Sequence, residues 1–135
     1  MSSRDNLENL LKSLNYLKEE NNGIPIIVEG KNDIRALRRL GFNGEIIKLP
    51  RNLSLENFCR LLSQRYNNVI LLMDWDTKGR RNILILTKYL RHYGVSVNID
   101  FWKLCFSLAS RMSNVEGLPA AFEAIEAERD IALRI

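Results

Sequence analysis

Apolar and polar positions follow two alternating patterns along the chain. Apolar residues spaced three or four positions apart are typical of helices, whereas short continuous apolar runs indicate strands buried on both faces. The first pattern predicts helices over residues 4–20, 31–41, 54–66 and 77–93. The second pattern, with an alternating run as its last member, predicts strands over residues 24–30, 44–50, 68–74 and 95–102. The remainder is predicted to be helical, with Pro119 in a first turn.

The order of these elements predicts the fold class. Strands that alternate with helices of ten or more residues favour a parallel sheet joined by right-handed crossovers, which is an α/β architecture. We expect a four-stranded, mostly parallel sheet flanked by helices, with residues 1–22 as an N-terminal helical extension and residues 23–135 as the domain itself. A chain of 135 residues suits one domain. No apolar run in it approaches the length that a membrane-spanning helix needs.

Local signals predict two helix ends and the state of the cysteines. Gly23 follows the first helix and is predicted to cap its C-terminus, and Ser54 is predicted to cap the N-terminus of a later helix. Cys59 and Cys105 lie far apart within apolar patterns, so we expect two buried thiols rather than a metal-ligand pair. Free thiols suit a reducing cytoplasm.

Carboxylates follow two of the predicted strands. Glu29 ends the first strand, Asp74 ends the third, and Asp76 comes two residues later. In open α/β sheets, ligands bind beyond the carboxyl ends of the strands, where the strand order reverses. If the strands stand in the order 2-1-3-4, these three acids converge on one crevice. Such carboxylates repel one another, and a divalent cation would compensate them; ligands that are all oxygen favour Mg²⁺ or Mn²⁺ over Zn²⁺.

Cations are concentrated directly behind the aspartates. The net charge is +4, but residues 77–98 contain several lysines and arginines and no acid. Lys78, Arg80 and Arg81 begin the helix after Asp76, and Lys31 begins the first crossover helix. Helix N-termini themselves attract phosphate. A metal held by acids and surrounded by cations is the layout of phosphoryl-transfer chemistry.

The acids also have structural interpretations. Asp74 and Asp76 could be a helix cap and a turn residue, and Glu29 could form a structural ion pair with a lysine. Asn32 and Asp33 are favoured as helix caps rather than ligands.

The aromatic and remaining basic residues are open to two interpretations as well. Trp75, between the aspartates, could stack on a base or pack over its loop. Phe101 and Trp102 are predicted to belong to the core. Three arginines are most simply a solvated helix face: Arg38, Arg39 and Arg91.

Two motifs together resemble the Toprim domain: VEG at 28–30 followed by a helix, and DWD at 74–76 with Gly79 beyond it. That domain occurs in type IA and type II topoisomerases, bacterial primases, OLD-family nucleases, the ribonuclease that matures 5S ribosomal RNA, and a recombination mediator. The run VEGKNDIRAL is most similar to small stand-alone Toprim proteins and to the 5S-maturing ribonuclease. The resemblance covers residues 24–125 and implies a Rossmann-like Toprim fold.

The resemblance implies roles for individual residues. Asp74 and Asp76 match the D-x-D that coordinates Mg²⁺. Glu29 matches the family glutamate, which is taken to be a general base or acid or a further metal ligand. Gly79 matches the glycine of D-x-D-x-x-G and is expected to support the site from behind the ligands.

Three further residues are carried over less directly. Lys31 and Asp33 lie in the EGKxD form of the first motif, where Asp33 is expected behind the metal ligands. Glu116 lies in a VEGL segment similar to one before the last helix of related proteins. It is expected to cap a helix rather than approach the metal.

The resulting hypothesis is a cytoplasmic stand-alone Toprim protein that acts on DNA or RNA with Mg²⁺, most simply by phosphodiester cleavage. The alternative is a non-catalytic module that binds nucleic acid or a partner protein in repair, replication or RNA processing, and a homodimer is compatible with both. A phosphoacceptor receiver domain is the third class. It requires paired acids after the first strand, whereas this chain has the single Glu29.

Overall fold

A four-stranded parallel sheet organises the chain, with its strands in the order β2-β1-β3-β4. The computed structural model describes residues 3–108 and 112–134. The strands are β1 (Ile26–Val28), β2 (Ile46–Lys48), β3 (Asn68–Leu71) and β4 (Ser96–Asn98). The helices are α1 (Ser3–Asn21), α2 (Lys31–Arg39), α3 (Leu55–Ser63), α4 (Thr77–His92), α5 (Asp100–Leu104) and α6 (Leu118–Arg134), with short 3-10 turns η1 (Cys105–Leu108) and η2 (Val115–Gly117).

The strand order confirms the predicted α/β fold and its switch point. β1 lies between β2 and β3, so Ile26 is opposite Ile46 on one side and Ile70 on the other. The chain passes from β1 outward to β2 and then returns across β1 to β3, which reverses the direction of winding. The carboxyl ends of β1 and β3 are therefore neighbours at the place where open α/β sheets bind ligands.

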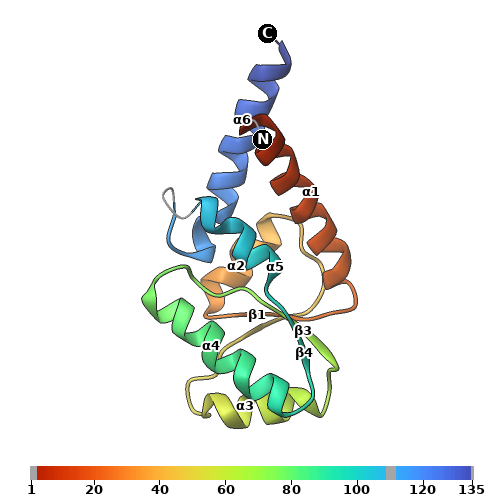
Figure 1. Ribbon diagram of the computed structural model, residues 1–135, viewed down its shortest axis with the longest axis vertical. Coiled ribbons are helices and arrows are strands. Elements are labelled where there is room, and N and C mark those ends of the chain that lie inside the picture. The colour runs from red at the N-terminus through yellow and green to blue at the C-terminus, as the bar shows by residue number, and fades with distance from the viewer. Residues whose placement is uncertain (1–2, 109–111, 135) are drawn as a thin grey trace.

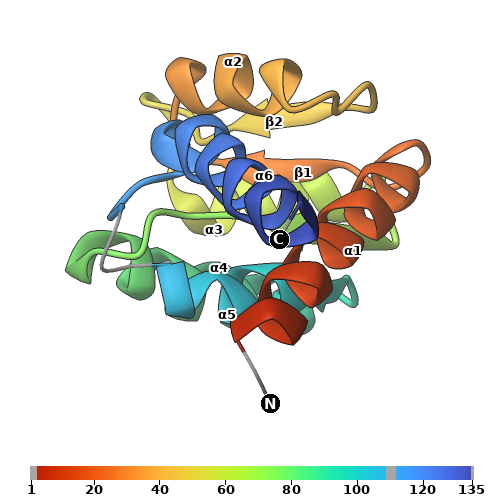
Figure 2. The same ribbon diagram turned by 90° about the horizontal axis from the view of Figure 1, so that it is seen from above.

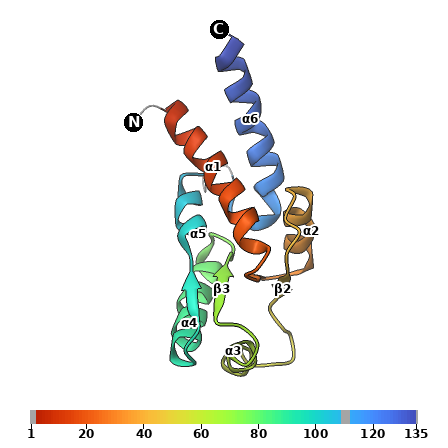
Figure 3. The same ribbon diagram turned by 90° about the vertical axis from the view of Figure 1, so that its right-hand side faces the viewer.

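The helices pack in groups around the sheet. α3 lies against α4, α2 contacts α6 and η2, and α1 contacts both α5 and α6. α1 and α6 extend together beyond the carboxyl ends of the strands, so that both termini lie at the same end of the molecule (Figures 1 and 3). Seen from above, α6 lies between α2 and α4 (Figure 2).

The core is continuous from the sheet into α1. The side chains of β1 are wholly inaccessible, and the second to fourth residues of β3 are buried with them. Four leucines of α1 join the same apolar cluster: Leu10, Leu11, Leu14 and Leu17. Burial of such a side chain contributes about 1.5–3 kcal/mol, so α1 is firmly attached. The division of the chain at residues 22 and 23 stays a prediction.

Two local predictions are wrong. The fourth strand ends at Asn98, because the Asn98 side chain accepts a hydrogen bond from the Asp100 backbone N–H at 2.9 Å and turns the chain into α5. Gly23 does not adopt the left-handed conformation, which Gly41 and Gly94 do adopt. Buried Asn21 ends α1 instead, with its amide group bonded to the Ile24 and Glu45 carbonyls at 3.0 Å each.

Several other local predictions are confirmed. Ser54 caps α3 by accepting a hydrogen bond from the Asn57 N–H at 3.1 Å. Cys59 and Cys105 are buried free thiols, and burial raises the pKa of Cys59 to about 11 and of Cys105 to about 12. Phe101 and Trp102 are buried, although in α5 rather than in a strand. Within the described part of the chain, no helix combines the length and apolar character needed to cross a bilayer.

Candidate metal and nucleic-acid site

Glu29 connects three elements at the carboxyl edge of the sheet. It directly follows β1, and its Oε2 accepts a hydrogen bond from the Asp74 backbone N–H at 3.0 Å. Its Oε1 accepts a second from the Asn82 side-chain amide at 2.8 Å. Both carboxylate oxygens are therefore bonded to groups beyond β1. Glu29 is fixed in position against the loop after β3 and the second turn of α4.

Asp74 lies beside Glu29 and is half-buried. Its Oδ1 accepts a hydrogen bond from the Val115 N–H in η2 at 2.8 Å, which brings the C-terminal segment to the sheet edge. Burial, followed by a side-chain hydrogen bond with Glu29, raises the pKa of Asp74 from 3.8 to about 7. The surroundings of Asp74 therefore disfavour its negatively charged form.

Asp76 caps α4, the helix that follows. Its Oδ1 accepts a hydrogen bond from the Gly79 N–H at 2.7 Å, and the residue is exposed. Gly79 has no room for a side chain, because an added Cβ would overlap the Asp74 carbonyl oxygen and lie 2.5 Å from its carbonyl carbon. The first turn of α4 therefore rests directly on the backbone of Asp74, which explains the D-x-D-x-x-G spacing.

Asp33 adds a fourth carboxyl group nearby. It is buried, and its Oδ2 accepts a hydrogen bond from the Gly30 N–H at 2.9 Å, so it caps α2 as predicted. Burial is the main cause of the raised pKa of Asp33, and the charges of Glu29 and Glu116 raise it further. Glu29, Asp33 and Asp74 thus form an acidic cluster at the carboxyl ends of β1 and β3.

Comparison with known proteins gives the family. A model of the Toprim domain matches residues 24–99, which is more than half of the chain. The chain belongs to the Toprim domain family. A UPF0292 protein of Thermoplasma volcanium is 40% identical over 116 residues, which cover 86% of this chain and 96% of that protein. A UPF0292 protein of Methanosarcina barkeri is 33% identical over 117 residues, covering 85% and 81% of the two chains.

A solved structure supports the same fold. A protein from Aquifex aeolicus superimposes with a TM-score of 0.66 at 27% identity, over 76% of this chain and 92% of that one. Membership of the Toprim family supports a nucleic-acid-related, metal-binding function, since Toprim domains generally bind a divalent metal such as Mg²⁺. The resemblance predicted from VEG and DWD is confirmed.

The acids of this Toprim domain fit a metal held by few protein ligands. Among residues 3–108 and 112–134, no three carboxylate, histidine or cysteine side chains converge as a ready metal site. Asp74 and Asp76 each use Oδ1 to accept a hydrogen bond from a backbone N–H. Mg²⁺ commonly takes one or two carboxylates and completes its shell with water and phosphate oxygens. The oxygen-only donor set therefore suits Mg²⁺ or Mn²⁺.

The four predicted phosphate-binding cations are all exposed: Lys31, Lys78, Arg80 and Arg81. Contacts with two aromatic residues hold the Arg80 side chain in place. Its Nε donates to the Trp75 carbonyl at 3.1 Å, and its guanidinium lies 5.4 Å from the centre of the Phe106 ring. Arg80 is therefore fixed over the loop that carries both aspartates.

Trp75 packs within its loop and is 2% exposed. Its backbone N–H donates to the Ser113 carbonyl at 2.8 Å, and its indole N–H donates to the Trp102 carbonyl at 2.9 Å. Of the two interpretations offered by the sequence, packing is correct, and no face of this ring is open to a base. The role of Trp75 is to hold the loop so that the carboxylates on either side are positioned.

Two groups of the site were missed by sequence analysis. The Asn82 amide and the Val115 backbone N–H bind Glu29 and Asp74 respectively. Asn82 carried a weak signal, because it is a polar residue next to buried Ile83 on the side of α4 that faces the sheet. Val115 carried none, since a backbone donor leaves no trace in the side-chain pattern.

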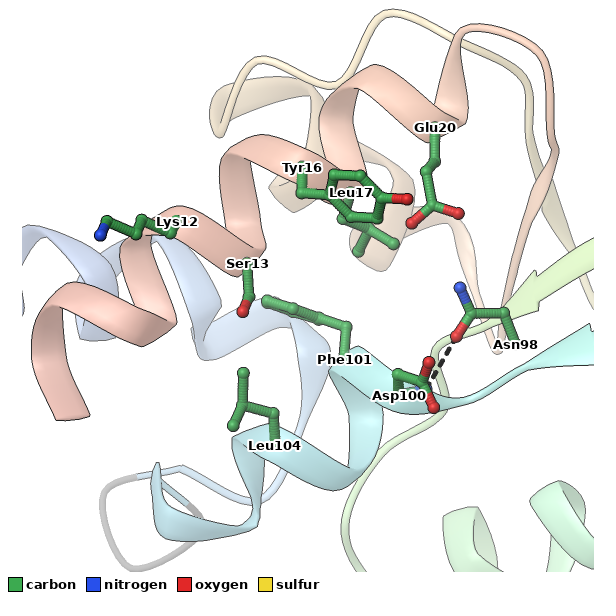
Figure 4. A pocket seen from close by; sticks show the side chains of 9 residues that line it. All are labelled: Lys12, Ser13, Tyr16, Leu17, Glu20, Asn98, Asp100, Phe101 and Leu104. Atoms are coloured by element: carbon green, nitrogen blue, oxygen red, sulfur yellow. Dashed lines mark hydrogen bonds between the residues drawn. The ribbon is translucent and has the colours of Figure 1, made fainter. Parts of the chain in front are cut away.

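A separate hollow of about 300 Å³ lies between α1 and α5 (Figure 4). Tyr16 and Leu17 of α1 face Phe101 and Leu104 of α5 across it. None of the acids of the Toprim site lines this hollow.

Proposed function

We propose that this Toprim protein cleaves phosphodiester bonds of nucleic acid with the help of Mg²⁺. The observation that supports the proposal is the pairing of Glu29 with the Asp74 backbone at the carboxyl ends of β1 and β3, two residues before Asp76 and next to the basic start of α4. Acids and cations that meet at a topological switch point are suited to phosphate chemistry. Two buried free thiols suit a cytoplasmic location.

Asp74 and Asp76 would hold the metal, with Glu29 close enough to assist. When bound, Mg²⁺ supplies neutralisation of phosphate charge and a more acidic bound water. Manganese would serve through the same oxygen donors. Glu116 is exposed on η2 and affects the pKa of Asp33 through its charge, but it provides no metal contact in this proposal.

The chain's own groups then have distinct tasks. Glu29 accepts a proton, because hydrogen bonds donated by the Asp74 N–H and the Asn82 amide hold its carboxylate in position. Lys31, Lys78 and Arg81 bind backbone phosphates.

Arg80 has the same task with less freedom of movement. Its anchoring to the Trp75 carbonyl lowers the entropy that is lost when it binds a phosphate. Asp33 and Gly79 act behind the site, by capping α2 and by allowing α4 to approach the Asp74 backbone.

The test combines metal binding with cleavage. Titration of the protein with Mg²⁺ and Mn²⁺ by calorimetry, and incubation with labelled RNA and DNA duplexes, would be done for the wild type and for Asp74→Asn/Asp76→Asn. We expect metal binding and cleavage in the wild type and neither in the double variant. Asp100→Asn is the matched control, since Asp100 is an exposed aspartate at the start of α5. Cleavage that persists in the double variant would contradict the assignment.

The second candidate is a non-catalytic binding module. It is favoured by the fact that both Glu29 oxygens and one Asp74 oxygen are already satisfied by protein donors, as in a purely structural network. Under this alternative, the protein binds nucleic acid or a partner protein, as a monomer or homodimer, and Glu29→Gln leaves that binding unchanged. Under the cleavage proposal, Glu29→Gln abolishes product formation while nucleic acid remains bound.

A further inference from the structure

The outer face of α4 carries a line of cations that continues away from the Toprim site. Arg81, Lys88 and Arg91 are exposed and spaced seven and three residues apart, which places them on one side of the helix. The opposite side carries buried Ile83, and α4 packs against α3 and β4. We call Arg81, Lys88 and Arg91 the α4 basic ridge.

The ridge is electrostatically uncompensated. The segment 77–98 contains no acidic residue, so α4 cannot neutralise its own cations through pairs within the helix. Ion pairs of the described residues, such as Arg39 with Glu123, lie elsewhere, and none includes a member of the ridge. Glu56 of α3 accepts a hydrogen bond from the Tyr93 hydroxyl at 3.5 Å, beyond the end of α4. A solvated helix face normally mixes both signs of charge, and this one does not.

The ridge is continuous with the candidate site. α4 begins immediately after Asp76, and Lys78 extends the line of cations into its first turn. From Lys78 to Arg91 the helix rises by about 20 Å at 1.5 Å per residue. α4 also lies at the periphery of the molecule, where an extended ligand can reach it (Figures 1 and 3). A polyanion bound at the site can therefore contact further positive charges along α4.

From this geometry we infer that the α4 basic ridge binds the phosphate backbone of a double-stranded nucleic acid whose scissile region lies at Asp74 and Asp76. The inference rests on the proposed function and adds the path of the substrate. A duplex is favoured over a single strand because single-strand platforms stack bases on exposed aromatic rings. The residue between Arg81 and Lys88 on the ridge is the exposed aliphatic Leu84. A duplex presents about one phosphate charge per 1.7 Å, so the straight line of about 20 Å from Lys78 to Arg91 always has several phosphates in reach.

The test measures binding by fluorescence anisotropy in EDTA, so that cleavage and metal do not enter. The probes are mixed-sequence DNA and RNA duplexes of about 24 base pairs and the corresponding single strands. The test variant is Arg81→Gln/Lys88→Gln/Arg91→Gln. The matched control is Arg35→Gln/Lys48→Gln/Arg51→Gln, three exposed cations of α2, β2 and the loop after β2. Each variant changes the net charge equally, from +4 to +1, since +4 minus 3 is +1.

We expect wild type and control to bind a duplex with a steep salt dependence. The ridge variant should bind at least about 10-fold more weakly at about 0.1 M salt. Its plot of log affinity against log salt should have a slope smaller by about 2.7, which is 0.9 for each of three phosphate contacts. Circular dichroism and urea denaturation would show that the ridge variant is folded, as expected for exposed side chains.

The inference would be overturned by equal losses in the two variants, by an unchanged salt slope in the ridge variant, or by tighter binding of single strands than of duplexes by the wild type. A wild type that binds no nucleic acid would also overturn it and would direct attention to an acidic protein partner. The cleavage proposal can be refuted independently of the ridge inference. If the ridge variant loses binding but the wild type never cleaves with Mg²⁺, the ridge inference stands and the nuclease proposal falls.

Discussion

Gly79→Ala tests how the D-x-D-x-x-G motif is built, because the space for a side chain there is known. An added Cβ would lie 2.5 Å from the Asp74 carbonyl carbon and 3.0 Å from its Cα. Carbon atoms normally approach to about 3.5 Å, so the first turn of α4 must withdraw from the loop by about 1 Å. That shift also disturbs the hydrogen bond from the Gly79 N–H to the Asp76 carboxylate.

The expected magnitude follows from three contributions. Overpacking against backbone costs about 1–3 kcal/mol, and the weakened cap costs about 1 kcal/mol. Alanine at this helical position offsets this with about 1 kcal/mol of better helix propensity. We therefore expect Gly79→Ala to lower the free energy of unfolding by about 1–3 kcal/mol. In urea this is a fall in midpoint of about 1 M.

The assay is urea denaturation followed by tryptophan fluorescence, with Gly30→Ala as the matched control. Gly30 also stands between a strand and a helix next to a site acid, but an added Cβ there has no atom within 4 Å. Its φ of −150° is open to any residue, so Gly30→Ala should change stability by less than about 0.5 kcal/mol. A Gly79→Ala variant as stable as wild type, or a larger loss in Gly30→Ala, would refute the proposed contact between α4 and the Asp74 backbone.

Two further predictions concern the acids themselves. Asn82→Leu leaves Oε1 of Glu29 without its side-chain donor and should cost about 1–3 kcal/mol of stability in urea denaturation, whereas a neutral result would mean that water replaces the amide without loss. In the metal-free protein, folded Asp74 keeps its proton up to about pH 7 while the unfolded chain loses it near 3.8, so stability should fall as pH rises through this window. Denaturation in EDTA at several pH values checks this, and Asp74→Asn should remove that part of the pH dependence.

The convergence of Glu29 and Asp74 could be predicted because it depends on strand order rather than on side-chain detail. Each acid follows a strong apolar run, and parallel strands place their carboxyl ends at one edge. Once β1 and β3 are neighbours, the two residues must meet. The helix periodicity was similarly informative, since buried Leu10 and Leu17 of α1 fall on the face that the spacing defined.

The partners of those acids could not be predicted, because they depend on tertiary packing. Asn82 is 53 residues from Glu29, and the Val115 N–H is 41 residues from Asp74. No local pattern couples positions that far apart. The predicted end of β4 was wrong for a different reason. The alternating pattern through Phe101 is as compatible with a buried helical turn as with a strand.

The two aspartates of the motif look equivalent in sequence, and the fold makes them different. Asp74 is half-buried and bonded to η2, and its raised pKa means that a cation binding there displaces a proton near neutral pH. Asp76 is exposed and caps α4, so a cation binding there must share the carboxylate with the Gly79 N–H. Asparagine caps helices as well as aspartate does, and the charge and the cap at position 76 are therefore separable. Loss of metal binding with unchanged stability in Asp76→Asn would then reflect the missing charge alone.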